Sequence, residues 1–147
     1  VASPAMWILS LLKLQPRPER SAPRHFEANP MLFFDLFSHA PTLVKIAAGE
    51  PLFREGEAGQ TMYVLIGGLA QISIRGRLVE VIRAGDIVGE MSIVSPGPRS
   101  ATVTATEPCE FVEVDTDRFN RLVGQTPEFA LSVMRVLADR LRRADLV

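Results

Sequence analysis

A glutamate and an arginine stand about ten residues apart in the segment from Gly89 to Val103, which reads GEMSIVSPGPRSATV. Between them lie a glycine turn, a stretch long enough for one helical turn, and a loop bracketed by Pro96 and Pro98. The start of a helix presents unpaired N–H groups and the positive end of a dipole, and both attract anions. Arginine is suited to bind phosphate oxygens, whereas glutamate is suited to accept a hydrogen bond from a hydroxyl. A phosphate beside a hydroxyl is the chemistry of a nucleotide.

The same segment resembles the phosphate-binding cassette of the cyclic nucleotide-binding domain family, whose pattern is roughly G-E-L/M-A/S-L/I, a short loop, and P-R-A/S/T-A-T/S-V/A. Residues 89–93 match the first half of this pattern, and residues 98–103 match the second half. The resemblance extends over roughly residues 42–145. Glycines fall where the family turns between strands, at Gly49, Gly56, Gly68 and Gly85. Val88 departs from the family, which often has phenylalanine there, but this change removes no ligand contact.

The resemblance implies a role for each matching residue. Glu90 would accept a hydrogen bond from a ribose 2′-hydroxyl, and Arg99 would pair with a cyclic phosphate. Ser100 and several backbone amides would also bind the phosphate. The amides concerned are those of Gly89, Glu90, Met91, Ser92 and Ala101. Taken alone, Glu90 would equally fit dipole complementation at a helix start, and Arg99 would fit a surface charge at the start of a strand.

The residue after the arginine bears on the choice of base. In the family that the segment resembles, threonine at this position accompanies guanine recognition, whereas alanine or serine accompanies adenine recognition. Ser100 therefore favours cAMP. Its hydroxyl could also reach a guanine amino group, so cGMP stays open as a ligand.

Residues outside the cassette are expected to surround the base. Three strand residues are candidates for its apolar walls, although each also fits a hydrophobic core: Ile82, Ile87 and Val103. Arg140 and Leu141 of the final helix are candidates for a lid, in which the guanidinium would stack on the base. Alternatively, Arg140 and its neighbours Arg142 and Arg143 complement the negative end of the helix dipole.

Glycine spacing and β-branched runs predict the fold class. Short runs of Val, Ile, Leu and Thr, interrupted by glycine every eight to twelve residues, are typical of an antiparallel sandwich or barrel. The predicted strands are 43–47, 51–53, 62–66, 70–74, 78–82, 87–88, 101–106 and 109–114. We therefore expect a mainly β domain, an antiparallel β-sandwich or jelly roll with a helical segment before it and two helices after it.

Helix signals lie on both sides of the predicted strands. Asn29 and Pro30 predict the start of a short helix within the aromatic cluster at residues 25–39. Asp115 is expected to cap a helix that Gly124 closes. Thr126 and Pro127 predict the start of the last helix, and its apolar residues form one stripe. The residues of that stripe are Phe129, Val133, Val136, Leu137 and Leu141.

A chain of 147 residues is long enough for one domain with its own core. Residues 1–24 combine a short apolar patch with a linker rich in proline and arginine, so we expect this segment to be flexible. Residues 25–147 are expected to form the cyclic nucleotide-binding domain, with the β-roll at about 42–115 and the C-terminal helices at about 116–146.

Charge, cysteine and hydropathy limit the class of protein. The chain has 16 basic and 17 acidic residues and a formal net charge of −1, so we expect no binding of nucleic acid. The single cysteine, Cys109, excludes an internal disulfide and suits the cytoplasm, where we expect the protein to reside. The longest apolar stretch, residues 5–14, is about half as long as a membrane span requires, so no transmembrane span is predicted.

Enzymatic and metal chemistry are not expected. The two histidines, His25 and His39, both precede the predicted sandwich, so neither a metal site nor a catalytic triad can be assembled within it. The resemblance instead implies a sensor that binds a cyclic nucleotide, without another cofactor, and signals through movement of the C-terminal helices. The alternatives are the sensor half of a Crp/Fnr-type transcription regulator, the regulatory domain of a channel or transporter, and an interaction domain that has lost its ligand. A homodimer stays open, and the downstream partner is not predicted.

Overall fold

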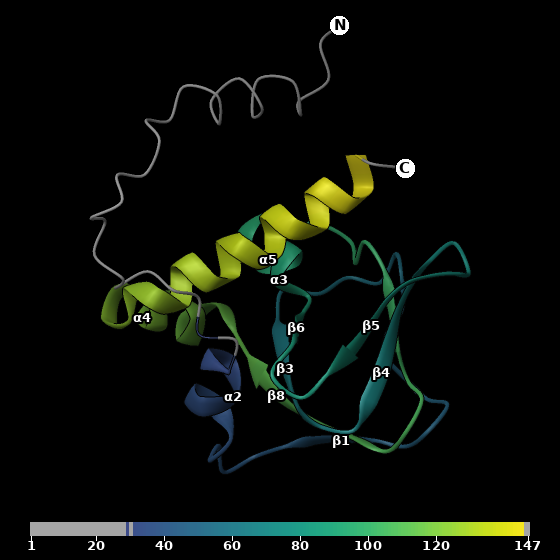
Figure 1. The fold of residues 1–147 in the computed structure, drawn as a ribbon, viewed down its shortest axis with the longest axis horizontal. Helices are drawn as coiled ribbons and strands as arrows, with labels where there is room; N and C mark the ends of the chain where they lie inside the picture. The colour runs from purple at the N-terminus through teal and green to yellow at the C-terminus, as the bar shows by residue number, and fades with distance from the viewer. Residues whose placement is uncertain (1–28, 30, 146–147) are drawn as a thin grey trace, which may run out of the picture.

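The computed structural model describes residue 29 and residues 31–145. The predicted flexible segment at residues 1–24, and with it His25, lies outside the described residues. The body is a β-roll of two antiparallel four-stranded sheets, and helices pack against one of them (Figure 1). The predicted fold class, mainly β with two C-terminal helices, is confirmed.

Each sheet combines distant parts of the chain. One sheet has the strand order β1-β8-β3-β6 and the other has the order β2-β7-β4-β5. The strands are β1 (Val44–Ile46), β2 (Pro51–Phe53), β3 (Met62–Gly67), β4 (Leu69–Ile74), β5 (Arg77–Arg83), β6 (Ile87–Val88), β7 (Thr102–Ala105) and β8 (Cys109–Val114). All eight predicted strands are present, and each boundary lies within one residue of the prediction.

The burial pattern of each strand depends on whether one or both faces of its sheet are covered by other elements. Val103 and Ala105 of β7 are buried and their neighbours in the strand are half-buried, because successive side chains point to opposite faces. In β3, by contrast, the adjacent residues Val64 and Leu65 are both buried. Leu65 packs between the two sheets, and Val64 packs under the helices. The sheet that contains β3 is therefore covered on both faces.

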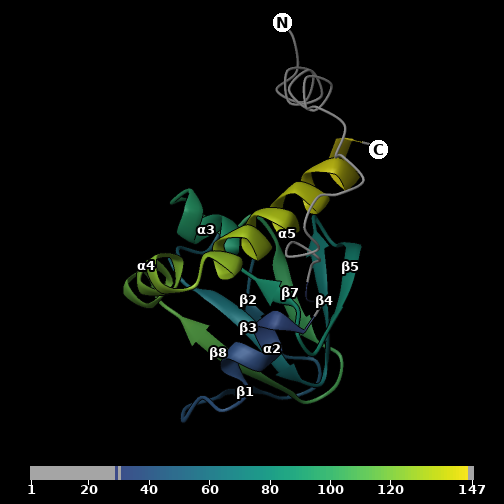
Figure 2. The same cartoon turned by 60° about the vertical axis from the view of Figure 1, so that its left-hand side comes forward.

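Four helices complete the described structure: α2 (Leu32–Phe37), α3 (Glu90–Val94), α4 (Thr116–Gln125) and α5 (Pro127–Asp145). Figures 1 and 2 both show α5 crossing the molecule beside α3, above the sheet that contains β3 and β6. The ring of Phe129 on α5 holds this layer together through edge-on contacts. Its centroid lies 6.0 Å from Phe33, 6.2 Å from Phe37 and 5.5 Å from Phe119.

The helix signals are confirmed at three starts. The side chain of Asn29 accepts a hydrogen bond from the Met31 N–H at 3.0 Å, just before α2. Asp115 caps α4 by accepting from the Arg118 N–H at 2.8 Å. Pro127 is the first residue of α5, as predicted.

Two predictions about the C-terminal helices were wrong. Gly124 does not close α4, which continues to Gln125, because Gly124 has no positive φ and the break comes instead before Pro127. Leu141 does not belong to the buried stripe of α5, since its side chain is 45% exposed whereas Val133 is 2% exposed. At this end of α5, the side chains that face β5 are those of Arg140 and Arg143, which both bind Glu80.

Among residues 29 and 31–145, no helix is long and apolar enough to cross a membrane. The same residues contain no group of three or more His, Cys, Asp or Glu side chains that could hold a metal ion.

Candidate functional site

Gly89 places the start of α3 against Arg99. Its φ of 77° lies in the left-handed region that side chains other than glycine disfavour. A Cβ atom at this position would lie 2.7 Å from Arg99 Nη1 and 2.8 Å from the Thr61 carbonyl oxygen. Only glycine therefore allows both the turn into α3 and the close approach of the arginine.

Arg99 is anchored below this turn and is only 5% exposed. Its guanidinium donates to the Thr61 carbonyl at 2.6 Å, to Thr61 Oγ1 at 3.0 Å and to the Gly89 carbonyl at 3.5 Å. It also stacks on Phe53, with Cζ 4.2 Å from the ring centroid. Burial lowers the pKa of Arg99 below its ordinary value, but a guanidinium keeps its proton in proteins. The site thus holds a fixed, buried positive charge.

Glu90 is the first residue of α3 and is only 2% exposed. Its Oε1 accepts a hydrogen bond and forms an ion pair with Arg140 Nη1 on α5. Its Oε2 is buried and has no hydrogen-bond partner among the described residues. Leaving a buried polar atom without a partner costs about 1–3 kcal/mol. Oε2 is therefore an acceptor that a ligand hydroxyl could satisfy.

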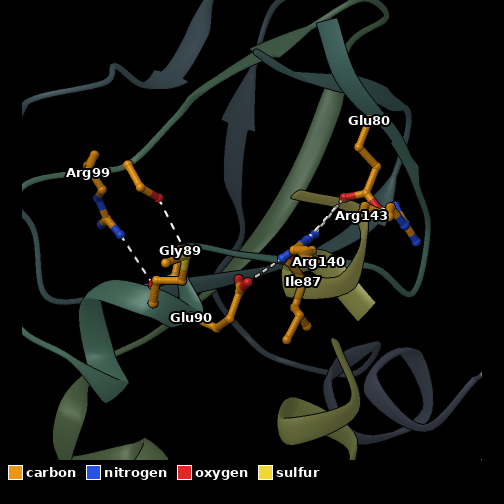
Figure 3. Close-up of polar contacts among 9 residues, drawn as sticks. Glu80, Ile87, Gly89, Glu90, Arg99, Arg140 and Arg143 are labelled. Carbon is orange, nitrogen blue, oxygen red and sulfur yellow. Dashed lines mark hydrogen bonds and ion pairs between the residues drawn. The ribbon is translucent and has the colours of Figure 1, made fainter. Parts of the chain in front are cut away.

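Arg140 joins three elements at this point. Besides Glu90, it donates from Nη2 to the Ile87 carbonyl at 2.8 Å and binds Glu80 on β5 at 2.9 Å from Nη2 and 3.1 Å from Nε. Burial lowers the pKa of Arg140, but Glu90 and Glu80 outweigh that effect, so its pKa is raised above the ordinary value. Figure 3 shows the resulting row of charged side chains, from Arg99 through Glu90 and Arg140 to Glu80.

The other cassette residues lie around α3. Ser100 is exposed, and its hydroxyl lies 3.6 Å from the Met91 sulfur, which brings the two halves of the cassette together. The Ser92 N–H donates to the Gly89 carbonyl at 3.2 Å and so closes the first turn. Ala101 is half-buried immediately before β7.

The residues predicted around the base lie in different places. Ile82 and Val103 are each 1% exposed and pack in the core between the sheets. Ile87 is also 1% exposed, but it packs in the core under the helices. Leu141 is largely exposed, whereas Arg140 points into the cassette, where it contacts Glu90. The two interpretations of Arg140 from the sequence, base stacking and dipole complementation, did not include this ion pair.

Sequence reasoning missed the residues that position the two charged groups of the cassette. Thr61 and Phe53 hold Arg99, and Glu80 holds Arg140. A signal for Glu80 was present, because it is the acidic residue within the otherwise apolar run Leu78–Ile82. Strand alternation places it on the same face as the buried Ile82. No comparable pattern marks Thr61.

A β-roll that presents a short helix, a buried glutamate and a buried arginine to one site defines the class of cyclic nucleotide-binding domains. The family model described as the cyclic nucleotide-binding domain matches residues 43–126. The chain belongs to this family.

Relatives in the family belong to several kinds of protein. The chain is 36% identical over 107 residues to a CRP-like cAMP-activated global transcriptional regulator of Mycobacterium tuberculosis, an alignment that covers 69% of this chain and 48% of the regulator. It is 34% identical over 90 residues to a cGMP-dependent protein kinase of Toxoplasma gondii, covering 61% of this chain and 9% of the kinase. The chain thus spans less than half of either relative.

Solved structures agree with this assignment. The catabolite activator protein of Thermus thermophilus superimposes with a TM-score of 0.67 and 27% identity, covering 84% of this chain and 59% of that protein. The cAMP-bound PfPKA-R fragment superimposes with a TM-score of 0.64 and 28% identity, covering 71% of this chain and 36% of that fragment.

Proposed function

We propose that this chain is a cyclic nucleotide sensor that binds cAMP. One observation carries the proposal: the cassette holds a buried glutamate whose Oε2 has no partner in the described chain, next to a buried arginine nine positions later in the sequence. In the proposed complex, Arg99 and the hydroxyl of Ser100 bind the cyclic phosphate, and Oε2 of Glu90 accepts from the ribose 2′-hydroxyl. Amides of residues 89–92 and Ala101 add hydrogen bonds to the phosphate.

The preference for cAMP over cGMP rests on Ser100. The chain is similar both to a cAMP-activated transcriptional regulator and to a cGMP-dependent protein kinase. Membership of the family alone therefore favours neither adenine nor guanine. In the proposed complex, Ile82, Ile87 and Val103 support the base from the core side. Leu141, which is exposed on α5, is available to approach the base when the helix moves.

The signal is proposed to pass through α5. Arg140 on this helix already contacts Glu90, so a ligand that binds Glu90 acts on the same ion pair that holds α5. A ligand shifts a conformational equilibrium only by the difference between its affinities for the two states. We infer a binding module rather than an enzyme, and we place it in the cytoplasm, where a buried free thiol such as that of Cys109 persists.

Three kinds of protein are candidates for the output: a transcription regulator, a protein kinase, and a channel or transporter. The chain aligns with 48% of a transcription regulator and with 9% of a protein kinase, so the domain could serve as the sensor of a larger regulator of either kind. The sensor half of a Crp/Fnr-type transcription regulator is the preferred alternative, because 69% of this chain aligns with such a regulator at 36% identity. The regulatory domain of a channel or transporter is the second alternative.

Calorimetric titration with cAMP, cGMP and 5′-AMP tests the proposal. We expect cAMP to bind more tightly than cGMP, because Ser100 replaces the threonine associated with guanine. 5′-AMP should bind far more weakly, since its phosphate is not held in a ring and carries an additional charge. Failure of both cyclic nucleotides to bind the folded protein would refute the proposed function, and tighter binding of cGMP would refute the base preference.

We also propose that the chain forms a homodimer through α5. Leu131, Met134 and Leu141 are exposed on this helix by 37%, 60% and 45%, and the half-buried Ala138 lies between Met134 and Leu141. These positions repeat at steps of three and four residues, which is the spacing of the contact seam in a coiled coil. A second copy of the same helix presents the matching seam, so the surface is self-complementary.

Met134→Glu is expected to convert the dimer to a monomer, because it places a charge in the centre of the seam. Light scattering coupled to gel filtration measures the change as a halving of the molecular mass. Val94→Glu is the matched control, since Val94 is also an exposed apolar residue but lies on α3. A monomeric parent protein would exclude the dimer, and a Met134→Glu variant that stays dimeric would exclude α5 as its interface.

A further inference from the structure

We propose that Glu80 is a positioning residue: it holds Arg140 so that the Glu90 carboxylate presents Oε2 to the ligand, and it thereby couples ligand binding to the packing of α5. This inference rests on the proposed nucleotide function and specifies how the site is regulated. It concerns a residue of β5 that lies outside the cassette in sequence.

The position of Glu80 in β5 directs its side chain toward the helices. Its neighbours Val79 and Val81 are 52% and 41% exposed, and they occupy the opposite face of the strand. The side chain of Glu80 is only 18% exposed. The alternation of side chains along β5 therefore places the Glu80 carboxylate on the face of the strand that points toward the site.

Each oxygen of Glu80 binds a different arginine of α5. Oε2 accepts from Nε and Nη2 of Arg140, at 3.1 and 2.9 Å, and Oε1 accepts from Nη1 of Arg143 at 2.5 Å. The two arginines are three residues apart, so they lie on the same side of the helix. Glu80 therefore links one turn of α5 to β5 through two ion pairs.

Arg140 transmits this attachment to the cassette. Its guanidinium is planar and rigid, so fixing Nε and Nη2 on Glu80 also fixes the direction of Nη1, which binds Glu90 Oε1. Glu90 itself is 2% exposed and has little room to rotate. Because Oε1 is occupied by Arg140, the unpartnered Oε2 is the oxygen left for a ligand hydroxyl.

The charges of this cluster balance. Two carboxylates, Glu80 and Glu90, meet two guanidinium groups, Arg140 and Arg143. Burial raises the pKa of Glu80, but Arg140 and Arg143 outweigh burial and lower its pKa below the ordinary value. Glu80 is accordingly ionised whenever the protein is near neutral pH. Without it, Arg140 would have one carboxylate partner in place of two, and the side chain would be free to leave Glu90.

Coupling between two sites is reciprocal in binding free energy. A ligand hydroxyl on Oε2 favours the Glu90 orientation that Arg140 holds, and so it favours the position of α5 in which Arg140 reaches Glu90. Conversely, loosening Arg140 from Glu80 weakens the ligand contact. The prediction is directional: removing the charge of Glu80 lowers nucleotide affinity, and this loss depends on the 2′-hydroxyl.

Glu80→Gln keeps the size of the side chain and removes its charge. We expect cAMP affinity, measured by calorimetry, to fall by about fivefold, at the lower end of typical coupling between sites. For 2′-deoxy-cAMP, which lacks the hydroxyl, the variant and the parent should bind alike. Glu110→Gln is the matched control, because Glu110 is a half-buried strand glutamate in β8 that forms no ion pair within the described residues.

Hydrogen exchange of the protein without nucleotide separates this inference from the proposed function. Glu80→Gln should speed amide exchange at residues 136–145, whereas Glu110→Gln should leave it unchanged. Unchanged exchange in the Glu80 variant would overturn the anchoring role. Equal losses of affinity for cAMP and 2′-deoxy-cAMP, or a gain in cAMP affinity, would overturn the coupling. If the parent binds no cyclic nucleotide, the coupling fails together with the proposed function, and the exchange experiment still decides whether Glu80 anchors α5.

Discussion

Arg99→Leu is expected to lower the affinity for cAMP by about 100-fold or more. The phosphate would lose at least two charge-assisted hydrogen bonds, which contribute about 1.5–3 kcal/mol each. Each 1.4 kcal/mol corresponds to about a tenfold change in affinity, so two such bonds account for the expected loss. Arg99→Lys should give an intermediate loss, because lysine keeps the charge but not the planar fork. Calorimetric titration of the purified variants measures both effects.

Arg118→Leu is the matched control for this experiment. Arg118 also stacks on a phenylalanine, with Cζ 5.0 Å from the ring centroid of Phe37, but it lies on α4, away from the cassette. Its replacement should leave cAMP affinity unchanged. Thermal unfolding of each variant confirms that it is folded, since Arg99→Leu also removes donors from the Thr61 carbonyl. An Arg99→Leu variant that is folded and binds cAMP like the parent would show that the phosphate lies elsewhere.

The strands could be predicted from patterns among residues that are close together in sequence. Val103 and Ala105 alternate with half-buried threonines, and glycines of positive φ, such as Gly56 and Gly85, stand at the turns before β3 and β6. Strand alternation and glycine turns depend on neighbours in sequence, so the sequence contains this information. The pairing of the strands into two sheets depends on contacts across the whole chain, so the sequence predicted a sandwich or jelly roll but no strand order.

Contacts between distant elements could not be predicted in the same way. Arg140 lies 60 residues from Glu80 and 50 residues from Glu90, and nothing in the spacing of the three residues indicates that they meet. The sequence placed Arg140 near the ligand through the resemblance to a lid, but its ion pair with Glu90 depends on how α5 crosses α3. Gly124 failed as a helix end for a different, local reason: Pro127, three residues later, set the boundary instead.

The cassette contains both kinds of residue: some that could be predicted from neighbours in sequence, and some that depend on contacts between distant elements. The types and spacing of Gly89, Glu90 and Arg99 predicted a site for a phosphate and a hydroxyl, and the match to the family pattern favoured that prediction over a helix-start carboxylate and a surface arginine. The side chains that prepare these residues for binding, Thr61 for Arg99 and Glu80 for Arg140, come from other strands. Candidate ligand-binding residues can therefore be predicted from one segment, whereas the residues that orient them can be found only from the fold.

Arg140→Met is expected to lower the free energy of unfolding by roughly 3 kcal/mol, the lower end of the cost of breaking a buried ion pair. Methionine preserves most of the volume of arginine but leaves the carboxylate of Glu90, which is 2% exposed, without a compensating charge. Chemical denaturation at neutral pH measures the loss. Arg142→Met is the matched control, because Arg142 is an exposed arginine on the same helix, and its pair with Asp139 spans 3.7 Å at the surface.

The double variant Glu90→Gln/Arg140→Met distinguishes a lost ion pair from lost packing. If the cost of Arg140→Met comes from an isolated buried charge, removing the charge of Glu90 as well should restore most of the stability, because replacing both members of a buried pair is often nearly neutral. Additive losses in the two single variants would instead show that Arg140 stabilises α5 independently of Glu90. That outcome would break the proposed connection between the cassette and the C-terminal helix, since the connection consists of this ion pair.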